Sequence, residues 1–412
     1  MSEIGAETRD TPVPEPGRSR AGNLVCPACH GPLQRHPDAL SCGAGCGSYP
    51  LIEDEVPDFL SGGQAGGSAQ FLAEHETGYR LGKEPPGFGI VGATRRFQSA
   101  FPKANARLGR WLWNRMLEKL QSFNAGHAVD GFSPELEETF ARTQKRERYR
   151  NPFNFYLQAM AVHLFGRVRL EEPSMEYGGN YGHLSNLVYG GRQRINFGVE
   201  YLAHSLREQM DPARPLARER HEVFDQLAVG SFQRLPFADG AIRTGIAMHI
   251  LDHVIPIHET LAEIARVLAP GGRFYATTYA EGIYRDLPDV VLMRRLGLFP
   301  ETYFNWRLRR INLRRNTAYV REGAYPTGQN RVGLDDWRRM AADAGLHIVE
   351  TIPYNFRIMD EVMDLAYQGF ECPEDLWPSI DHEFKIMCQR EVDGTPGFDE
   401  TSNVLLVFER MQ

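Results

Sequence analysis

Four cysteines near the start of the chain have the types and spacing of a metal site. Two residues separate Cys26 from Cys29, twelve separate Cys29 from Cys42, and three separate Cys42 from Cys46. Four thiolates from two tight turns suit tetrahedral zinc, and the glycines around the second pair let the backbone wrap a metal. Because four cysteines close the coordination sphere, we expect a structural zinc ion rather than a catalytic one.

The segment around these cysteines, residues 23–60, is predicted to form a zinc ribbon. A ribbon of about 40 residues cannot build a sufficient apolar core alone, so a metal would act as its folding staple. The alternative role is recognition of a substrate or a partner protein. The sequence leaves both roles open.

Residues 230–278 contain the elements that must position any larger site. An L-P-F-x-D-G turn leads into an apolar strand over 241–248, and an amphipathic helix follows over 257–268. The helix is predicted to stop at the Pro-Gly-Gly cluster of 270–272, which opens a second strand over 273–278. Strand, loop, helix, turn and strand form the repeating unit of a parallel α/β sheet.

In its residues as well as its hydrophobic pattern, this segment resembles the second half of class I S-adenosylmethionine (SAM) methyltransferases of the ubiquinone-biosynthesis type. The resemblance implies a doubly wound, mostly parallel seven-stranded sheet of Rossmann-like fold, with SAM at the carboxyl ends of the first strands. Residues 48–60 also resemble the tail of small zinc-ribbon domains that are found beside, or fused to, methyltransferases.

The resemblance places a glycine-rich cofactor turn at residues 176–182. The usual motif is D-x-G-x-G-x-G, and Asn180 occupies the position of its middle glycine. Asparagine tolerates a positive φ better than most residues, so the turn can survive, although the side chain adds bulk beside the ligand. The predicted cofactor residues of this turn are Glu176, Tyr177, Gly178, Gly179, Asn180 and Gly182.

The resemblance implies the remaining cofactor residues at three later positions in the chain. Glu200, followed by Tyr201, stands 24 residues after Glu176 and would bond the ribose hydroxyls. Ser231 stands where an aspartate usually reaches the adenine, and Phe232 can pack on the adenine ring. Met248, at the end of the fourth strand, completes the predicted set. These departures leave room for a fold that binds SAM for other chemistry or has become a non-catalytic scaffold.

The predicted catalytic residues are His249 and Tyr279, which follow the fourth and fifth strands. Methyl transfer from a sulfonium needs mainly proximity and in-line alignment. A general base is needed only if the acceptor must lose a proton, and His249 is the candidate. Asp252 and His253 are expected to cap the next helix rather than to act chemically.

Residues 61–165 are predicted to form a linker and a helical lid subdomain. Ser133, Pro134 and Glu135 make a good helix start, with an N-cap serine, proline at the first position and acid in the first turn. An earlier stretch has apolar residues at helical spacing, which predicts a helix. These residues are Leu108, Trp111, Leu112, Met116, Leu117 and Leu120.

Two insertions are predicted in the domain of residues 166–412. The first, at about 280–332, contains nine arginines and three acids over residues 285–321, with aromatic residues interleaved. These side chains could grip a carboxylate, a phosphate or an RNA backbone, or could form a solvated lid. The second, at about 355–400, is rich in methionine and aromatic residues, which fits a pocket wall or plain core.

The composition limits the partners. The 412 residues carry a net charge of −7, which gives no electrostatic reason to expect nucleic acid. No stretch approaches the roughly 20 apolar residues of a membrane span. Residues 1–22 have no apolar core of a signal peptide, so we expect a disordered leader and a cytoplasmic protein.

The sequence therefore predicts a SAM-dependent methyltransferase that acts on a small or medium organic acceptor, in specialised metabolism or glycan modification. An anionic acceptor is one candidate. The first alternative is methylation of rRNA or tRNA, because a cysteine ribbon fused to this fold also resembles 23S rRNA guanine methyltransferases. The second is a non-catalytic SAM-binding or scaffold protein. The sequence leaves the oligomeric state open.

Overall fold

The computed structural model describes residues 24–52, 55–60, 100–127, 129, 131–144, 152–178, 183–190, 192–200, 223–251, 257–279, 334–367, 370, 372–394 and 396–412. The predicted leader at 1–22 and the insertion at 280–332 lie outside these residues. So do the glycine-rich part of the predicted linker and the predicted helix caps Asp252 and His253.

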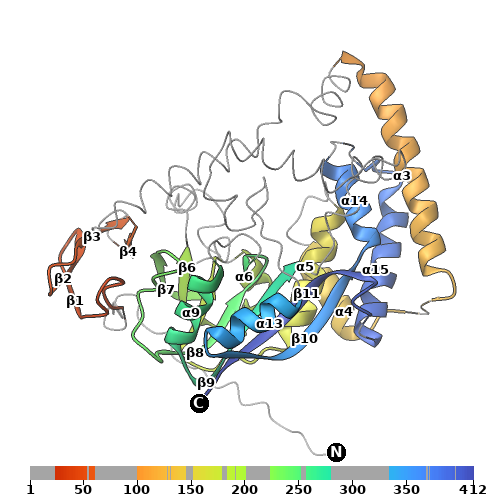
Figure 1. Cartoon of the computed structure of the whole chain (residues 1–412). Helices are drawn as coiled ribbons and strands as arrows, with labels where there is room; N and C mark the ends of the chain where they lie inside the picture. The colour runs from red at the N-terminus through yellow and green to blue at the C-terminus, as the bar shows by residue number, and fades with distance from the viewer. Residues whose placement is uncertain are drawn as a thin grey trace, which may run out of the picture.

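A seven-stranded sheet has the order β10-β11-β9-β8-β5-β6-β7 (Figure 1). The strands from β9 to β7 in that order pair in parallel, whereas β11 runs antiparallel to both β9 and β10. The predicted doubly wound, mostly parallel sheet of seven strands is confirmed. Its strands are β5 (Ser174–Tyr177), β6 (Ile195–Glu200), β7 (Phe224–Val229), β8 (Ile242–Ala247), β9 (Leu268–Tyr279), β10 (Leu346–Phe356) and β11 (Thr401–Arg410).

Two apolar clusters cover the two faces of this sheet. On one face lie α9 (Ile257–Val267) and α13 (Leu334–Asp343), which bury Leu261, Ile264 and Trp337. On the other lie α5 (Pro152–Gly166) and α6 (His183–Tyr189). α9 shows the stripe that its sequence predicts, because apolar residues three and four apart lie on one side of a helix.

The Pro-Gly-Gly cluster at 270–272 does not separate the helix from the strand as the sequence suggests. α9 ends at Val267, and β9 begins at once with Leu268, which pairs with Ile242. The ladder is irregular between Ile242 and Thr244, and Gly271 has a φ of 73°. The cluster is therefore absorbed as an irregularity at the start of β9, since glycine tolerates that backbone conformation.

A group of helices that includes α5 packs together at the β10 end of the sheet (Figure 1). Ser133 Oγ accepts the N–H of Leu136 at 3.3 Å, as expected of the predicted N-cap. α3 contacts α14 and α15, so a segment that precedes the first strand of the large sheet in the sequence packs against segments near the end of the chain. The helices not yet given bounds are α3 (Pro102–Asn124), α4 (Pro134–Gln144), α14 (Ile358–Tyr367) and α15 (Trp377–Asp393).

The apolar residues of the predicted helix α3 are buried only in part. Trp111 is 58% exposed and Leu108 is 38% exposed, whereas Trp113 is fully buried beside Met116 and Leu120. Trp113 Nε1 donates to the carbonyl of Phe370 at 3.0 Å. Apolar residues occur on several sides of this helix, so the buried side is chosen by the helices that pack against it.

A small four-stranded antiparallel sheet carries the cysteines at the opposite, β7 end of the large sheet (Figure 1). We call residues 24–60 the ribbon. Asp58 forms a parallel bridge with Val229 of β7, so the ribbon adjoins an edge of the large sheet. Its strands are β1 (Leu33–Arg35), β2 (Ala39–Cys42), β3 (Ser48–Ile52) and β4 (Val56–Pro57).

Strand β10 continues through a proline near its carboxyl end. Pro353 pairs with Val404, and the strand continues to Phe356. A proline cannot donate to a sheet ladder, but β10 is an edge strand, where proline is tolerated. Among the helices that the structure describes, none is long and apolar enough to cross a membrane.

Candidate functional site

The strand order reverses between β5 and β8, and this point defines the candidate site. From β5 the chain moves outward through β6 to β7, and from β8 it moves the other way to β9. In open α/β sheets, ligands bind outside the carboxyl ends of the strands at such a reversal. Gly178 follows β5 and His249 follows β8, so these two loop starts flank the site.

Gly178 occupies a position that only glycine fits without strain. Its φ is 62°, and its N–H donates to the carbonyl of Val199 at 2.8 Å. A Cβ added here would lie 2.9 Å from Cδ1 of Ile250. The backbone after β5 therefore passes tightly beneath the loop after β8. The predicted partners Gly179, Asn180 and Gly182 lie outside the described residues.

Glu176 is fully buried at the carboxyl end of β5, next to Gly178. Burial raises the pKa of the Tyr189 phenol, and the nearby charge of Glu176 raises it further. Met248 is also buried, in the same apolar cluster as Tyr189. An acidic side chain is thus held beneath the carboxyl edge of the sheet between β5 and α6.

Glu200 is the last residue of β6, and its backbone pairs with Val229 at the end of β7. It therefore stands at the carboxyl edge, one strand away from Glu176, as its predicted role requires. Tyr201 lies outside the described residues.

Tyr177 and Phe232 form a stacked pair in the core. Their ring centroids are 3.8 Å apart, and the Tyr177 hydroxyl donates to the carbonyl of Phe232 at 2.8 Å. Tyr177 is fully buried, and Phe232 is 8% exposed. Both remain predicted cofactor residues, and the structure gives the pair a second role in fixing the loop after β7 against β5.

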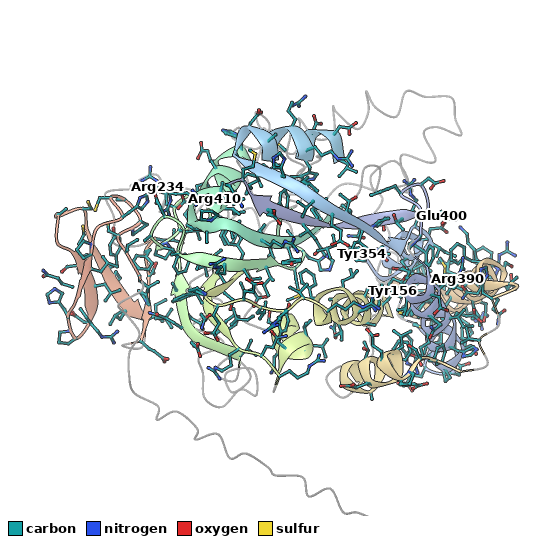
Figure 2. The ribbon with its side chains drawn as sticks, turned by 90° about the horizontal axis from the view of Figure 1, so that it is seen from below. Tyr156, Arg234, Tyr354, Arg390, Glu400 and Arg410 are labelled. Atoms are coloured by element: carbon teal, nitrogen blue, oxygen red, sulfur yellow. The ribbon has the colours of Figure 1, made fainter. Side chains whose placement is uncertain are left out.

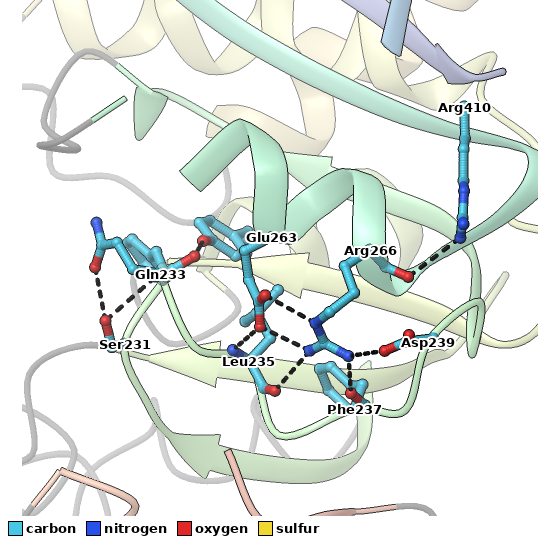
Figure 3. Close-up of polar contacts among 10 residues, drawn as sticks. Ser231, Gln233, Leu235, Phe237, Asp239, Glu263, Arg266 and Arg410 are labelled. Carbon is cyan, nitrogen blue, oxygen red and sulfur yellow. Dashed lines mark hydrogen bonds and ion pairs between the residues drawn. The ribbon is translucent and has the colours of Figure 1, made fainter. Parts of the chain in front are cut away.

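The loop after β7, residues 230–240, carries Ser231 and is tied to α9 (Figure 3). The Ser231 hydroxyl donates to Oε1 of Gln233 at 2.6 Å, and Gln233 Nε2 donates to Oγ1 of Thr260 at 3.1 Å. Glu263 accepts the N–H of Leu235 at 2.6 Å. Ser231 is half-buried, and its hydrogen bond to Gln233 positions its hydroxyl.

Arg266 holds the same loop through several hydrogen bonds. Its guanidinium donates to the carboxylate of Glu263 at 2.7 and 2.8 Å and to the carbonyls of Leu235 and Phe237 at 3.2 and 2.8 Å (Figure 3). It also donates to Asp239 at 2.7 Å, which lowers the pKa of that carboxyl. Sequence reasoning missed Arg266, because its role depends on the fold of a loop that precedes it by about thirty residues.

His249 starts the loop after β8 with a φ of 57°, in the left-handed region. Its N–H donates to Oγ1 of Thr277 at 2.8 Å, and its ring lies 6.3 Å from the ring of Tyr354. In backbone register, Tyr354 pairs with Asn403, and Asn403 pairs with Tyr279. The structure thus brings both predicted catalytic residues to one edge and adds Thr277, Tyr354 and Asn403, which sequence reasoning missed.

A buried polar network supports this edge from the helical side. The Glu391 carboxylate accepts the N–H groups of Asn355 and Phe356, at 3.0 and 3.3 Å, and also the Tyr156 hydroxyl. Figure 2 shows Tyr156 and Tyr354 close together where the helices meet the sheet. Burial raises the pKa of Glu391 to about 8. The network fixes the backbone directly after Tyr354.

The four cysteine sulfurs all lie within 4.8 Å of one another. Cys29 Sγ and Cys42 Sγ are 3.5 Å apart, and Cys26 Sγ is 3.2 Å from the Tyr49 hydroxyl. A hydrogen bond from the Cys46 backbone lowers the pKa of Cys42 to about 6, whereas the Cys29 thiol raises the pKa of Cys46 to about 12. Sulfurs around a tetrahedral zinc are roughly 3.8 Å apart, so the cluster has the dimensions of such a site.

Parts of the chain are similar to known proteins. Residues 194–276 match the family described as a methyltransferase domain. Among solved structures, the chain is similar to a geranyl diphosphate methyltransferase in complex with SAM, at 17% identity, 70% coverage of this chain and 95% of that one, and a TM-score of 0.37. It is also similar to the YcgJ protein of Bacillus subtilis, at 17% identity, 63% and 99% coverage, and a TM-score of 0.35. No curated protein sequence matches the chain.

The matched segment runs from the start of β6 into β9, so it includes Glu200, the loop of Ser231 and the His249 turn. These are the parts of the sheet that form one side of the candidate site. With the matched domain set in a doubly wound seven-stranded sheet, the chain is a SAM-dependent methyltransferase.

Proposed function

We propose that this enzyme transfers a methyl group from SAM to a small or medium organic acceptor at the carboxyl edge beside β5 and β8. The observation that carries the proposal is the turn at Gly178, which only glycine fits without strain and which lies against Ile250 and next to the buried Glu176. Such a turn lets a ligand approach the backbone closely at the strand-order reversal. The resemblance to the ubiquinone-biosynthesis type of methyltransferase supports the same assignment.

The residues at this edge fit the parts of SAM. The turn at Gly178 would pass beside the methionyl part, and Glu200, at the end of β6, would accept hydrogen bonds from the ribose hydroxyls. Ser231 and Phe232 would lie on the adenine side, because their loop follows the neighbouring strand β7. Bound SAM would supply an electrophilic methyl group on a sulfonium.

His249 and Tyr279 are proposed to face the acceptor. The Thr277 hydroxyl holds the His249 backbone, and Tyr354 borders the imidazole ring, so the ring is placed at the edge of β8. If the acceptor must lose a proton, His249 would accept that proton. The remaining rate enhancement would come from alignment of the acceptor with the methyl group.

Calorimetric titration with S-adenosylhomocysteine tests the cofactor site. We expect micromolar binding by the wild type and a loss of at least tenfold in Glu200→Ala. The matched control is Glu350→Ala, since Glu350 is exposed on β10 and should not affect binding. Absence of binding by the wild type, or equal binding by both variants, would contradict the proposed site.

We also propose that Cys26, Cys29, Cys42 and Cys46 hold one structural zinc ion. The closeness of their four sulfurs supports this, and a closed set of four thiolates leaves no position for catalysis. Metal analysis should find one zinc per chain in the wild type and none after Cys29→Ser with Cys46→Ser. Cys372→Ser is the control, because Cys372 lies outside the cluster. Zinc retained by the double variant would contradict the proposal.

A further inference from the structure

We propose that the ribbon is part of the cofactor site, and that its residues position the loop carrying Ser231 and Phe232. This inference rests on the proposed function, since it assigns these two residues to the adenine side of SAM. It gives the ribbon a role beyond folding and beyond recognition of an acceptor.

Two backbone hydrogen bonds join the ribbon to both ends of this loop. The N–H of Phe59 donates to the carbonyl of Val229 at 2.8 Å, and the N–H of Val25 donates to the carbonyl of Pro236 at 3.0 Å. Val229 ends β7, and Pro236 lies seven residues later, so the two contacts enclose the segment that contains Ser231 and Phe232. Because backbone groups make these contacts, they fix the path of the loop itself.

Apolar contacts continue from the cysteines to the stacked pair. One buried cluster contains Cys26, Cys42, Tyr49 and Phe59 of the ribbon together with Tyr177, Phe232 and Leu235. The rings of Tyr49 and Phe59 are 4.9 Å apart, and the Tyr49 hydroxyl touches Cys26 Sγ. The residues that hold the metal therefore pack in the same core as the ring beneath the predicted adenine site.

The opposite side of the loop is already held by α9. Glu263 accepts the N–H of Leu235, and Thr260 accepts from Gln233. At the end of β7, the carbonyl of Val229 accepts the N–H of Phe59 from the ribbon. Figure 2 shows Arg234 on the side of the sheet that faces the ribbon.

Metal binding and cofactor binding should therefore be coupled. Loss of the metal would loosen Cys26, Tyr49 and Phe59, and with them the hydrogen bonds to Val229 and Pro236. Coupling between two binding sites is reciprocal, so SAM or its product should raise zinc affinity by the same factor that zinc raises theirs.

The test measures the dissociation constant of S-adenosylhomocysteine by calorimetry on the full chain. Phe59→Ala removes a ring that the ribbon contributes to the core shared with Phe232, and Phe140→Ala removes a buried ring from the distant helix α4. We expect Phe59→Ala to raise the dissociation constant at least tenfold while the variant still contains one zinc per chain. Phe140→Ala should change it less than threefold.

A second measurement uses the wild type and does not depend on the folding of a variant. Removal of zinc with a chelator should weaken S-adenosylhomocysteine binding at least tenfold, and S-adenosylhomocysteine should slow zinc release. Unchanged binding after both Phe59→Ala and chelation would overturn this inference and leave the cofactor site intact. A wild type that binds no S-adenosylhomocysteine would overturn the proposed function and this inference with it.

Discussion

The hydroxyl of Tyr177, at the end of β5, donates to the carbonyl of Phe232, two strands away, while the two rings stack 3.8 Å apart. This pair connects the turn at Gly178 with the loop after β7, which are predicted to bind opposite ends of SAM. Substitution of either residue should therefore change both the turn at Gly178 and the loop after β7.

Replacing Tyr177 by phenylalanine should destabilise the protein by about 1–2 kcal/mol, because the buried carbonyl of Phe232 loses its donor. It should also weaken S-adenosylhomocysteine binding. Urea denaturation and calorimetry measure the two effects. Tyr189→Phe is the matched control, since the Tyr189 hydroxyl is buried without a hydrogen-bond partner among the described residues. A larger loss of stability in the control would contradict the assigned role of Tyr177.

Gly178→Ala should place a methyl group against Ile250 and force alanine into a left-handed backbone. We expect a cost of about 1–3 kcal/mol and at least a tenfold weaker binding of S-adenosylhomocysteine. Gly166→Ala provides the comparison, because its Cβ would meet nothing within 4 Å. Equal binding by the two variants would show that the turn does not approach the ligand.

Arg266→Ala should be much more damaging than an ordinary surface substitution. The side chains of Arg266 and Glu263 are only 17% and 10% exposed, so removal of the guanidinium leaves a nearly buried carboxylate without its counter-ion. A loss of roughly 2–4 kcal/mol in the free energy of unfolding is expected. Arg273→Ala breaks the exposed pair with Glu409 and should cost about 1 kcal/mol or less. Similar losses for both variants in urea denaturation would contradict this difference.

The stability of the protein should fall as the pH rises from about 5 to about 8 because of Glu391. Burial raises its pKa to about 8 in the folded chain, from an ordinary value of 4.5. The folded state therefore binds more protons than the unfolded state in this interval, and folding is favoured at the acid end. Glu391→Gln keeps the shape and should flatten the dependence, which urea denaturation at several pH values would show.

The control for this substitution is Glu361→Gln on α14, where the carboxylate is half exposed and paired with Lys119. Its stability should follow the wild-type dependence on pH. If Glu391→Gln also followed it, the titration would belong to another group.

Much of the candidate site was accessible from the sequence because its parts follow local patterns. The strand–helix–strand unit and the four cysteines can each be recognised within a short stretch, whereas the acid at the end of β6 is implied by the family resemblance. Their positions relative to one another follow from the fold class, since successive parallel strands end at one edge.

Two features that local patterns do not predict depend on partners distant in the chain. Trp113 rather than Trp111 is buried because Phe370 and α15 lie against that side of α3. β10 continues through Pro353 because it forms the edge of the sheet. No local periodicity records either fact.

The sequence by itself predicted the α/β fold, through its strand–helix–strand pattern and its resemblance to a known family, and the cysteine cluster, through the spacing of four residues. Only the tertiary structure decided that the N–H of Phe59 bonds to the carbonyl of Val229 and that Tyr177 stacks on Phe232. It also decided that Arg266 holds the loop after β7 through the carbonyl of Leu235. These contacts join segments far apart in the sequence, and they form because burial of one shared core selects which surfaces meet.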